Sequence, residues 1–268
     1  MALRVNTNVE AFNAHRNLAA TSVSQSKSME KLSSGLRINR AADDAAGLAI
    51  SEGMRGQIRG TAQAQRNAQD GISLVQTAEG ALNQMHSILG RVRELAVQNA
   101  NGTLSTSDQA KISTEIGQLT AELTRIRDSS EFNGKDLFGT SGAGATFTIQ
   151  VGANETTDSS TNVNRIGVAV AAITFGNVNT TVASIDAVIT AVSNARSTLG
   201  AVQNRLEHSI NNLGVYQENL SAAESRIRDV DMAAEMVNFT KLGILAQSGT
   251  SMLAQANQAP QGVLSLIR

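Results

Sequence analysis

The residues that most often carry chemistry are few and scattered in this chain. His15, His86 and His208 lie far apart, with no HExxH sequence and no second ligand at metal-binding spacing. The two aspartates of "RDVDMA", Asp229 and Asp231, lack further ligands, so they suit a charged junction between helices better than a metal site. The glycine-rich "GTSGAGA" leads into no lysine-bearing helix start and is no phosphate loop. We therefore expect no catalytic constellation, no metal, no cofactor and no enzyme activity.

The composition indicates a chain whose surface is largely covered. Charged residues make up 17% of the 268 residues, against about 25% in typical globular domains. Small and amide residues fill the deficit, and interface cores are likewise depleted in charge. The formal net charge of −1 argues against nucleic acid as a main partner. The sequence contains no cysteine, which excludes disulfides.

Targeting and membrane segments are not expected. The start, "MALRVNTNVE", lacks the apolar stretch of an ordinary signal peptide. Nor does the sequence contain an uncharged run of 18 apolar residues, so we expect no membrane-spanning helix and no membrane partner.

Apolar residues at alternating steps of four and three predict long helices, and these helices would position any functional residues of the chain. From residue 185 this pattern continues without a proline to about residue 230, which predicts one helix about 65 Å long at about 1.5 Å per residue. A compact domain of this length has a radius of gyration of only about 18 Å. The pattern therefore predicts a rod rather than a globule.

Two further segments, 74–96 and 112–126, repeat the same spacing and supply partners for the long helix. Three such stripes predict an antiparallel helical bundle or coiled coil. Polar residues at seam positions (Arg196, Gln203, Gln217 and Glu224) are expected to fix its register. The predicted seam consists of Leu89, Val92, Ile116, Leu123, Leu199, Leu206, Leu213 and Leu220.

A stripe of the smallest residues occupies 42–60, at the same spacing. It contains Gly53, Gly56 and Gly60, and each glycine inside a helix costs about 1 kcal/mol relative to alanine. Either another backbone approaches this helix closely, or the segment is a loose, non-helical one. Asp43 and Asp44 suit the first turn of a helix.

Strand signals are confined to about 132–176, between the second and third helical parts. "EFNGKDLF" contains an Asn-Gly turn signal. "ATFTIQVGA" alternates Phe147, Ile149 and Val151 with polar residues, as a half-buried strand does. "NRIGVAVAAITF" could form another strand, giving a small β-hairpin region.

The C-terminal segment, 229–268, is unusually apolar for a chain end. Gly243, Gly249 and Pro260 are expected to break it into short helical pieces, which are marginal in water below about 12–15 residues. We therefore expect it to be largely disordered in the free chain and to fold on assembly. The residues expected to act in assembly and chaperone binding are Met232, Met236, Phe239, Leu242, Leu245, Leu253, Val263, Leu264, Leu266 and Ile267.

Several long segments resemble bacterial flagellin. "MEKLSSGLRINRAADDAAGLAISEGMRGQIRG" and "NAQDGISLVQTAEGALNQMHSILGRVRELAVQNAN" are similar to its N-terminal half. "ENLSAAESRIRDVDMAAEMVNFTK" and "GTSMLAQANQAPQGVLSLIR" are similar to its C-terminal half. The resemblance covers 1–138 and 180–268, and about 40 residues stand where longer flagellins carry large outer domains.

The resemblance implies a mainly α fold whose two ends pair in an inner layer, 1–42 with 229–268, inside an outer bundle of 43–228. It implies a homopolymer, the extracellular flagellar filament, whose subunits are exported unfolded through the flagellar secretion apparatus. It also implies an export chaperone, a filament cap protein and hook-junction proteins as partners. A hook–filament junction or related secreted rod protein is the alternative.

Receptor-activating flagellins carry an arginine and a leucine on one helix and a glutamate on the next as receptor contacts. The motifs "RVRELAVQNAN" and "STEIGQ" match these at Arg91, Leu95 and Glu115. The resemblance therefore implies recognition of the monomer by a host Toll-like receptor. The alternative is that Leu95 is only a core residue and Arg91 only a solvated charge.

Overall fold

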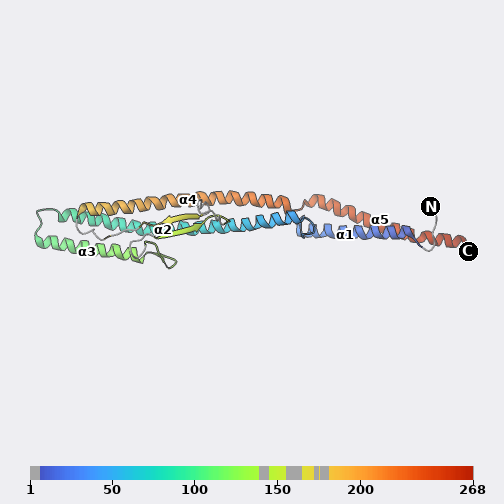
Figure 1. Cartoon of the computed structure of the whole chain (residues 1–268), viewed down its shortest axis with the longest axis horizontal. Coiled ribbons are helices and arrows are strands. Elements are labelled where there is room, and N and C mark those ends of the chain that lie inside the picture. The colour runs from blue at the N-terminus through green and yellow to red at the C-terminus, as the bar shows by residue number, and fades with distance from the viewer. Residues whose placement is uncertain (1–6, 139–144, 155–164, 172–174, 176–180, 268) are drawn as a thin grey trace. The chain divides into compact units, whose positions relative to one another are not determined.

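The computed structural model describes all residues except 1–6, 139–144, 155–164, 172–174, 176–180 and 268, and only the backbone of 259–267. The predicted glycine-rich loop at 139–145 lies almost entirely outside the described residues. Figure 1 shows that helices dominate, as the sequence predicts. The helices are α1 (Val9–Ser34), α2 (Ala45–Asn99), α3 (Thr106–Ser129), α4 (Val182–Arg228) and α5 (Met232–Ile267). The strands are β1 (Glu131–Phe132), β2 (Lys135–Asp136), β3 (Thr146–Gln150) and β4 (Arg165–Ala169).

The chain divides into two compact units, with α2 and α4 contributing to both. One unit, the terminal unit, contains residues 1–55 and 220–268, and the other, the central unit, contains 56–219. The boundary that the sequence predicts, at 42/43 and 228/229, falls at the turn before α2 and at the short break between α4 and α5.

The core of the central unit is formed by the apolar stripes of α2, α3 and α4. Of the predicted seam, Leu89, Val92, Leu123, Leu199 and Leu206 are fully buried. Ile116 and Leu213 are also buried, and Leu220, which belongs to the terminal unit, is half-buried. The four-three spacing works because residues at these steps lie on one face of a helix.

The polar seam residues make contacts near the edges of this packing. Arg196 on α4 forms an ion pair with Glu79 on α2, at 3.5 Å. Gln203 donates to Glu207 on its own helix, at 3.0 Å, and Glu224 lies 3.7 Å from Arg55. Their role in setting register stays a prediction.

Side chains cap the starts of two helices, and Asp44 is one that the sequence predicts. The Ser105 hydroxyl accepts a hydrogen bond from the Asp108 backbone N–H and caps α3. The Asp44 carboxylate accepts from the Gly47 backbone N–H at 2.8 Å and caps α2. Asp43 instead accepts from the N–H groups of Asn39 and Arg40, and so shapes the turn before α2.

The strands form two small antiparallel ribbons in the central unit. Asn133 and Gly134 join β1 to β2 with φ values of 51° and 71°, as a tight Asn-Gly hairpin turn requires. β3 pairs with β4 from Thr146↔Ala169 to Gln150↔Arg165. Ile149 of β3 packs against α2 where Gly71 lacks a side chain.

The small-residue segment forms the first turns of α2, so the helical alternative is confirmed and the loose one is wrong. Of the three glycines of the stripe, Gly60 alone shows the expected close approach of another backbone, because a Cβ there would stand 3.0 Å from the Ala153 Cβ and 3.2 Å from the Ala153 carbonyl oxygen. Gly53 and Gly56 have open space where a Cβ would stand. Ala42 precedes the helix and does not belong to it.

Candidate assembly interface

Helices α1 and α5 pack side by side in the terminal unit (Figure 1). We call them the terminal pair. Mostly small or polar residues lie between them. The buried and half-buried positions of both helices repeat at steps of three and four, as in a two-helix coiled coil. On α1 the positions that follow these steps are Ala11, Ala14, Leu18, Thr21, Gln25, Ser28 and Leu32, and on α5 they are Glu235, Phe239, Leu242, Ala246, Gly249, Leu253 and Ala256.

Specific contacts join the two helices along their length. The Asn8 side-chain amide donates to the Ala256 carbonyl at 2.7 Å. Leu18 lies 3.1 Å from the position where a Cβ of Gly249 would stand, so the glycine admits the leucine. The buried Ser28 hydroxyl donates to the Glu235 carboxylate, and it accepts from the Asn238 side-chain amide at 3.3 Å.

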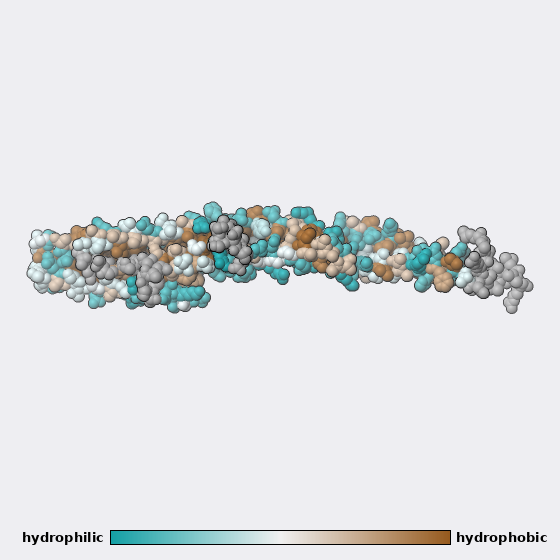
Figure 2. All heavy atoms as spheres, viewed as in Figure 1, coloured by the Kyte–Doolittle hydropathy of each residue, from teal (hydrophilic) through white to brown (hydrophobic). Residues whose placement is uncertain are grey.

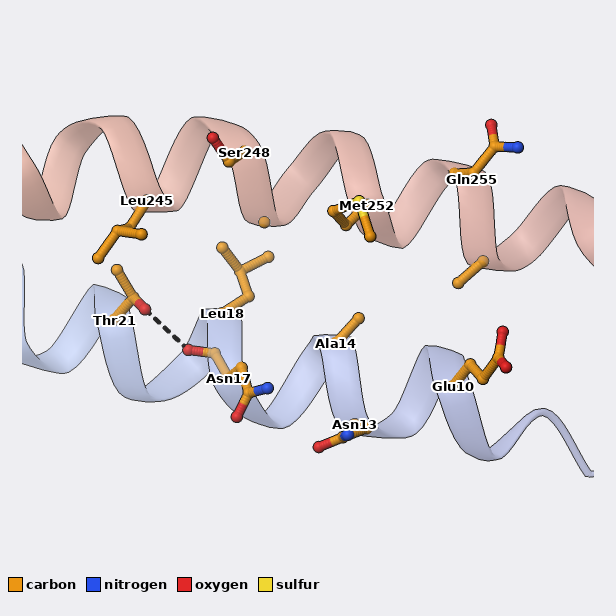
Figure 3. A pocket seen from close by; sticks show the side chains of 12 residues that line it. Glu10, Asn13, Ala14, Asn17, Leu18, Thr21, Leu245, Ser248, Met252 and Gln255 are labelled. Atoms are coloured by element: carbon orange, nitrogen blue, oxygen red, sulfur yellow. Dashed lines mark hydrogen bonds between the residues drawn. The ribbon is translucent and has the colours of Figure 1, made fainter.

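A shallow groove of about 720 Å³ runs between the two helices near the chain ends. In Figure 3, Ala14 and Leu18 point toward α5 and Leu245 points back toward α1. Met252 also lines the groove. Small residues of the lining, such as Ala14, Gly249 and Ala256, leave this space between the helices unfilled.

Many of the large apolar residues of the terminal pair are exposed outside this seam. Phe12 is 71% exposed and Val237 is 70% exposed. Figure 2 shows hydrophobic residues on the surface of this part of the chain. We call the following set of exposed residues the outer face: Val9, Phe12, Val23 and Met29 of α1 with Met232, Met236, Val237 and Ile244 of α5.

The residues predicted for assembly therefore have two different environments. Phe239, Leu242 and Leu253 are half-buried on the side of α5 that meets α1. Met232 and Met236 are exposed on the outer face, whereas Leu245 is exposed but lines the groove between the helices. Val263, Leu264, Leu266 and Ile267 belong to the segment whose side chains lie outside the described parts.

The expectation that α5 is broken into short pieces is wrong for this structure. A single helix extends from Met232 to Ile267, through Gly243, Gly249 and Pro260. Glycine costs about 1 kcal/mol in a helix, but at Gly249 it also lets Leu18 pack closely. Packing against α1 can thus offset the propensity that argues for a break.

Hydrogen bonds join the segment that follows α1 to the short segment between α4 and α5, and we call this part of the terminal unit the corner. After α1, Gly35 adopts a left-handed φ of 73° and its N–H caps the Lys31 carbonyl. Leu36 and Asp229 form an antiparallel bridge. The Val230 N–H donates to the Gly35 carbonyl at 3.0 Å, and the Arg37 guanidinium donates to the Ile227 carbonyl at the end of α4.

Charged side chains reinforce this corner. Arg228 is only 12% exposed and lies 2.7 Å from Glu52 of α2. The hydrogen bond from Arg228, with a further one from Arg55, lowers the pKa of the Glu52 carboxyl. Asp231 accepts from the N–H groups of Ala233 and Ala234 and caps α5. Asp229 and Asp231 thus lie at a junction between helices, as their spacing indicates.

The predicted receptor contacts come together in the central unit, but they are not equally accessible. Arg91 of α2 lies 3.2 Å from Glu115 of α3 and 3.2 Å from Glu94. The hydrogen bonds to Glu94 and Glu115 raise the pKa of the Arg91 guanidinium. Leu95 is only 2% exposed and belongs to the core.

Among the residues that the structure describes, no cluster of histidine and acidic side chains could hold a metal ion. Within the same residues, no helix is long and apolar enough to cross a membrane.

Sequence reasoning missed two parts of this interface. It did not identify the apolar residues of α1, because they lie outside the helix seam and therefore follow no core spacing. It also missed Arg37 and Glu52, whose partners lie far away in the sequence. The paired seam of small residues was detectable in principle, since its steps of three and four are present in the sequence.

The fold and the interface are those of a helical structural protein. Its N-terminal and C-terminal helices pack together, and several of their apolar side chains are exposed to solvent. Family models agree with that class: residues 5–143 match the bacterial flagellin N-terminal helical region and 182–267 match the bacterial flagellin C-terminal helical region. Only 144–181 separate the two matches. The chain belongs to the bacterial flagellin family, and this membership places it among the structural proteins of the extracellular flagellar filament.

Relatives match over nearly their whole lengths. A flagellin of Halalkalibacterium halodurans is 55% identical over 98% of this chain and 99% of its own length. A flagellin of Bacillus subtilis is 48% identical over 99% of this chain and 100% of its own. The crystal structure of Bacillus cereus flagellin is 30% identical, covers 55% of this chain and 88% of that chain, and superposes with a TM-score of 0.46.

Proposed function

We propose that this chain polymerises by burying the outer face of its terminal pair against other copies. The observation that carries the proposal is that many large apolar side chains of α1 and α5 are exposed outside the seam, where the chain itself does not cover them. Burying a valine, isoleucine or phenylalanine side chain contributes about 1.5–3 kcal/mol. Neighbouring copies would supply the cover that a single chain lacks.

The test is polymerisation of the purified chain, measured as the lowest concentration that supports filaments. Val237→Ser with Ile244→Ser should raise that concentration by about tenfold or more, because two apolar side chains lose their burial. Val97→Ser, at a valine of the central unit that is 52% exposed, should change it little. Equal effects of both variants would contradict the assignment of the interface.

A dedicated chaperone and export in an unfolded state form part of the same proposal. Exposed apolar surface of this extent promotes aggregation unless something covers it. A chaperone that wraps α5 before assembly would provide that cover. A cap protein at the tip of the filament and hook-junction proteins at the base of the filament would be further partners. Co-purification of a chaperone with the full chain, and its loss on removal of 229–268, would support this step.

Recognition of the monomer by the flagellin-sensing Toll-like receptor is a separate proposal. Its support is that Arg91 and Glu115 are exposed and lie together on neighbouring helices. Leu95 is buried, so it would not touch the receptor and would only hold α2 and the exposed Arg91 in place. Leu95→Ala would therefore lose about 2–5 kcal/mol of stability, which makes it a poor test of contact.

Arg91→Ala with Glu115→Ala tests the receptor proposal more cleanly, because both side chains are exposed. Receptor signalling should fall strongly while helicity stays unchanged. Arg125→Ala is the matched control, because Arg125 is an exposed arginine that pairs with Glu122 on α3. Unchanged signalling from the folded double variant would refute the proposal.

A junction or related secreted rod protein is the second candidate, because such proteins share the terminal motifs. Stoichiometry separates the two. In isolated filaments a major subunit dominates the protein mass, whereas a junction protein is present in few copies.

A further inference from the structure

Methionine is the only sulfur-containing residue of this chain, and three methionines are exposed on the outer face. The sequence contains seven methionines and no cysteine. Met29 is 55% exposed on α1, and Met232 and Met236 are 47% and 50% exposed on α5. Methionine is among the residues that are most often buried, so its accumulation on this surface calls for a reason.

The three methionines lie on the same side of the terminal pair. The Ser28 hydroxyl donates to the Glu235 carboxylate, so these two residues face each other across the seam. Met29 follows the first and Met236 follows the second, each about 100° further around its helix. The helices are antiparallel (Figure 1), and in an antiparallel pair equal turns away from the seam lead to the same side. Met232 lies one turn before Met236 and therefore shares its orientation.

An exposed thioether reacts with oxidants of the peroxide class. The sulfur lone pair attacks one oxygen of hydrogen peroxide, the O–O bond breaks, and a sulfur–oxygen bond forms. Sulfur loses two electrons and becomes a sulfoxide, and the peroxide is reduced to water. A flexible apolar side chain is thereby converted into a polar one.

Two other methionines provide a comparison within the same chain. Met85 is 0% exposed in the core of the central unit, so an oxidant does not reach its sulfur in the folded chain. Met252 is 64% exposed, but it lines the groove between α1 and α5. Exposure therefore predicts which sulfurs react, and position predicts which of these reactions affect assembly.

We propose that Met29, Met232 and Met236 form an oxidation-sensitive site of the free chain, and that their sulfoxides block self-assembly. The sulfoxide oxygens need hydrogen-bond partners, which a contact formed by apolar side chains does not supply, and burying them without partners is costly. Assembly in turn protects the thioethers, because the oxidant no longer reaches them. The inference rests on the proposed self-assembly and adds a chemical modification that controls it.

Peroxide treatment of the purified full-length monomer tests the proposal. Peptide mass spectrometry should find sulfoxide early at the three outer-face methionines, and at Met85 only after long treatment. The lowest concentration that supports filaments should rise about tenfold or more. Methionine sulfoxide reductases for both sulfur epimers, supplied with dithiothreitol, should restore the original concentration, because they convert sulfoxide back to thioether.

Leucine variants identify the residues responsible, because leucine keeps nearly the volume of methionine and lacks the reactive sulfur. The triple variant Met29→Leu, Met232→Leu and Met236→Leu should polymerise near the wild-type concentration both before and after peroxide. Met252→Leu is the matched control, because it removes an exposed thioether that lies outside the outer face. This control should lose assembly after peroxide as the wild type does.

Preformed filaments supply a second measurement that needs no substitution. Their outer-face methionines should be oxidised several-fold more slowly than those of the monomer, because oxidation follows exposure. Failure of the untreated wild type to polymerise would contradict the proposed function. Normal polymerisation of the oxidised wild type, loss of assembly in the triple variant after peroxide, or equal oxidation of filament and monomer would overturn this inference.

Discussion

Leu206 shows how strongly single residues of the central core determine stability. It is fully buried on α4 and lies near Gly71 of α2. We expect Leu206→Arg, and equally Leu89→Arg, to lower the free energy of unfolding by several kcal/mol, because a buried charge without a partner is costly. Urea unfolding followed by circular dichroism measures this change.

Val97→Arg provides the matched control for the core variants, since Val97 is 52% exposed on the same helix as Leu89. It should shift the free energy of unfolding by about 0.5 kcal/mol or less. If the buried and exposed substitutions cost the same, the seam assignment is wrong.

The contribution of Glu52 to the stability of the corner depends on pH. Its pKa is lowered in the folded chain, mainly by Arg228, from an ordinary value of 4.5. The unfolded chain therefore binds the proton first as the pH falls, and the stabilisation is lost below about pH 4.5. Glu52→Gln should destabilise the protein at pH 7, and the difference from the wild type should shrink toward pH 3.

The test compares urea unfolding of the wild type and Glu52→Gln across this pH range. Other carboxylates contribute to the slope of each protein, so only the difference between the two is informative. A difference that stays constant from pH 7 to pH 3 would show that Glu52 does not carry the effect.

At the scale of elements, the sequence predicts long helices well and their partners less well. The stripes of α2, α3 and α4 combine large apolar residues at regular steps, so the burial of Leu89 or Leu206 follows from spacing alone. The seam between α1 and α5 uses alanine, serine and glycine, which also occur on exposed helix faces. Hydrogen bonds such as that from Arg37 to the Ile227 carbonyl join distant residues and leave no local pattern.

The glycines of α2 test what small residues contribute to a helix. Gly56 has open space around it, whereas Gly60 meets Ala153 closely. We expect Gly56→Ala to stabilise the folded chain by about 0.8–1 kcal/mol through helix propensity. Gly60→Ala should gain less or destabilise, because the new Cβ would stand 3.2 Å from the Ala153 carbonyl oxygen.

Thermal unfolding of both alanine variants decides this point, since their helix propensities are the same. A similar gain for both would mean that the segment after β3 moves away from α2 without cost. If Gly56→Ala lowers the thermal stability, another part of the free chain must lie against α2 at Gly56.

At the scale of the whole molecule, the stability of a single chain favours buried apolar residues at the chain ends, whereas assembly requires some of them to stay exposed. The central unit buries its large apolar residues within one chain, so it is expected to fold alone. The terminal pair leaves many of its large apolar residues exposed, so under the proposed function other copies complete their burial. A subunit built in this way gains most of its terminal stability at the moment of assembly.

We therefore predict that deletion of 229–268 abolishes polymerisation while the remaining chain stays helical. The deletion removes all of α5, including Phe239, Leu242 and Leu253, which face α1. It also removes Asp229 and Val230, which hold the corner. Circular dichroism and electron microscopy of the truncated chain measure the two outcomes.

Limited proteolysis tests the coupling between order and assembly without any substitution. Local opening is easiest where few apolar contacts protect the backbone, and in the free chain this condition applies to α1 and α5. Monomer should lose both ends quickly and retain a resistant central fragment, whereas filament should resist cleavage throughout. Equal protection of α5 in monomer and filament would show that the terminal pair is already stable alone, and that assembly does not order it.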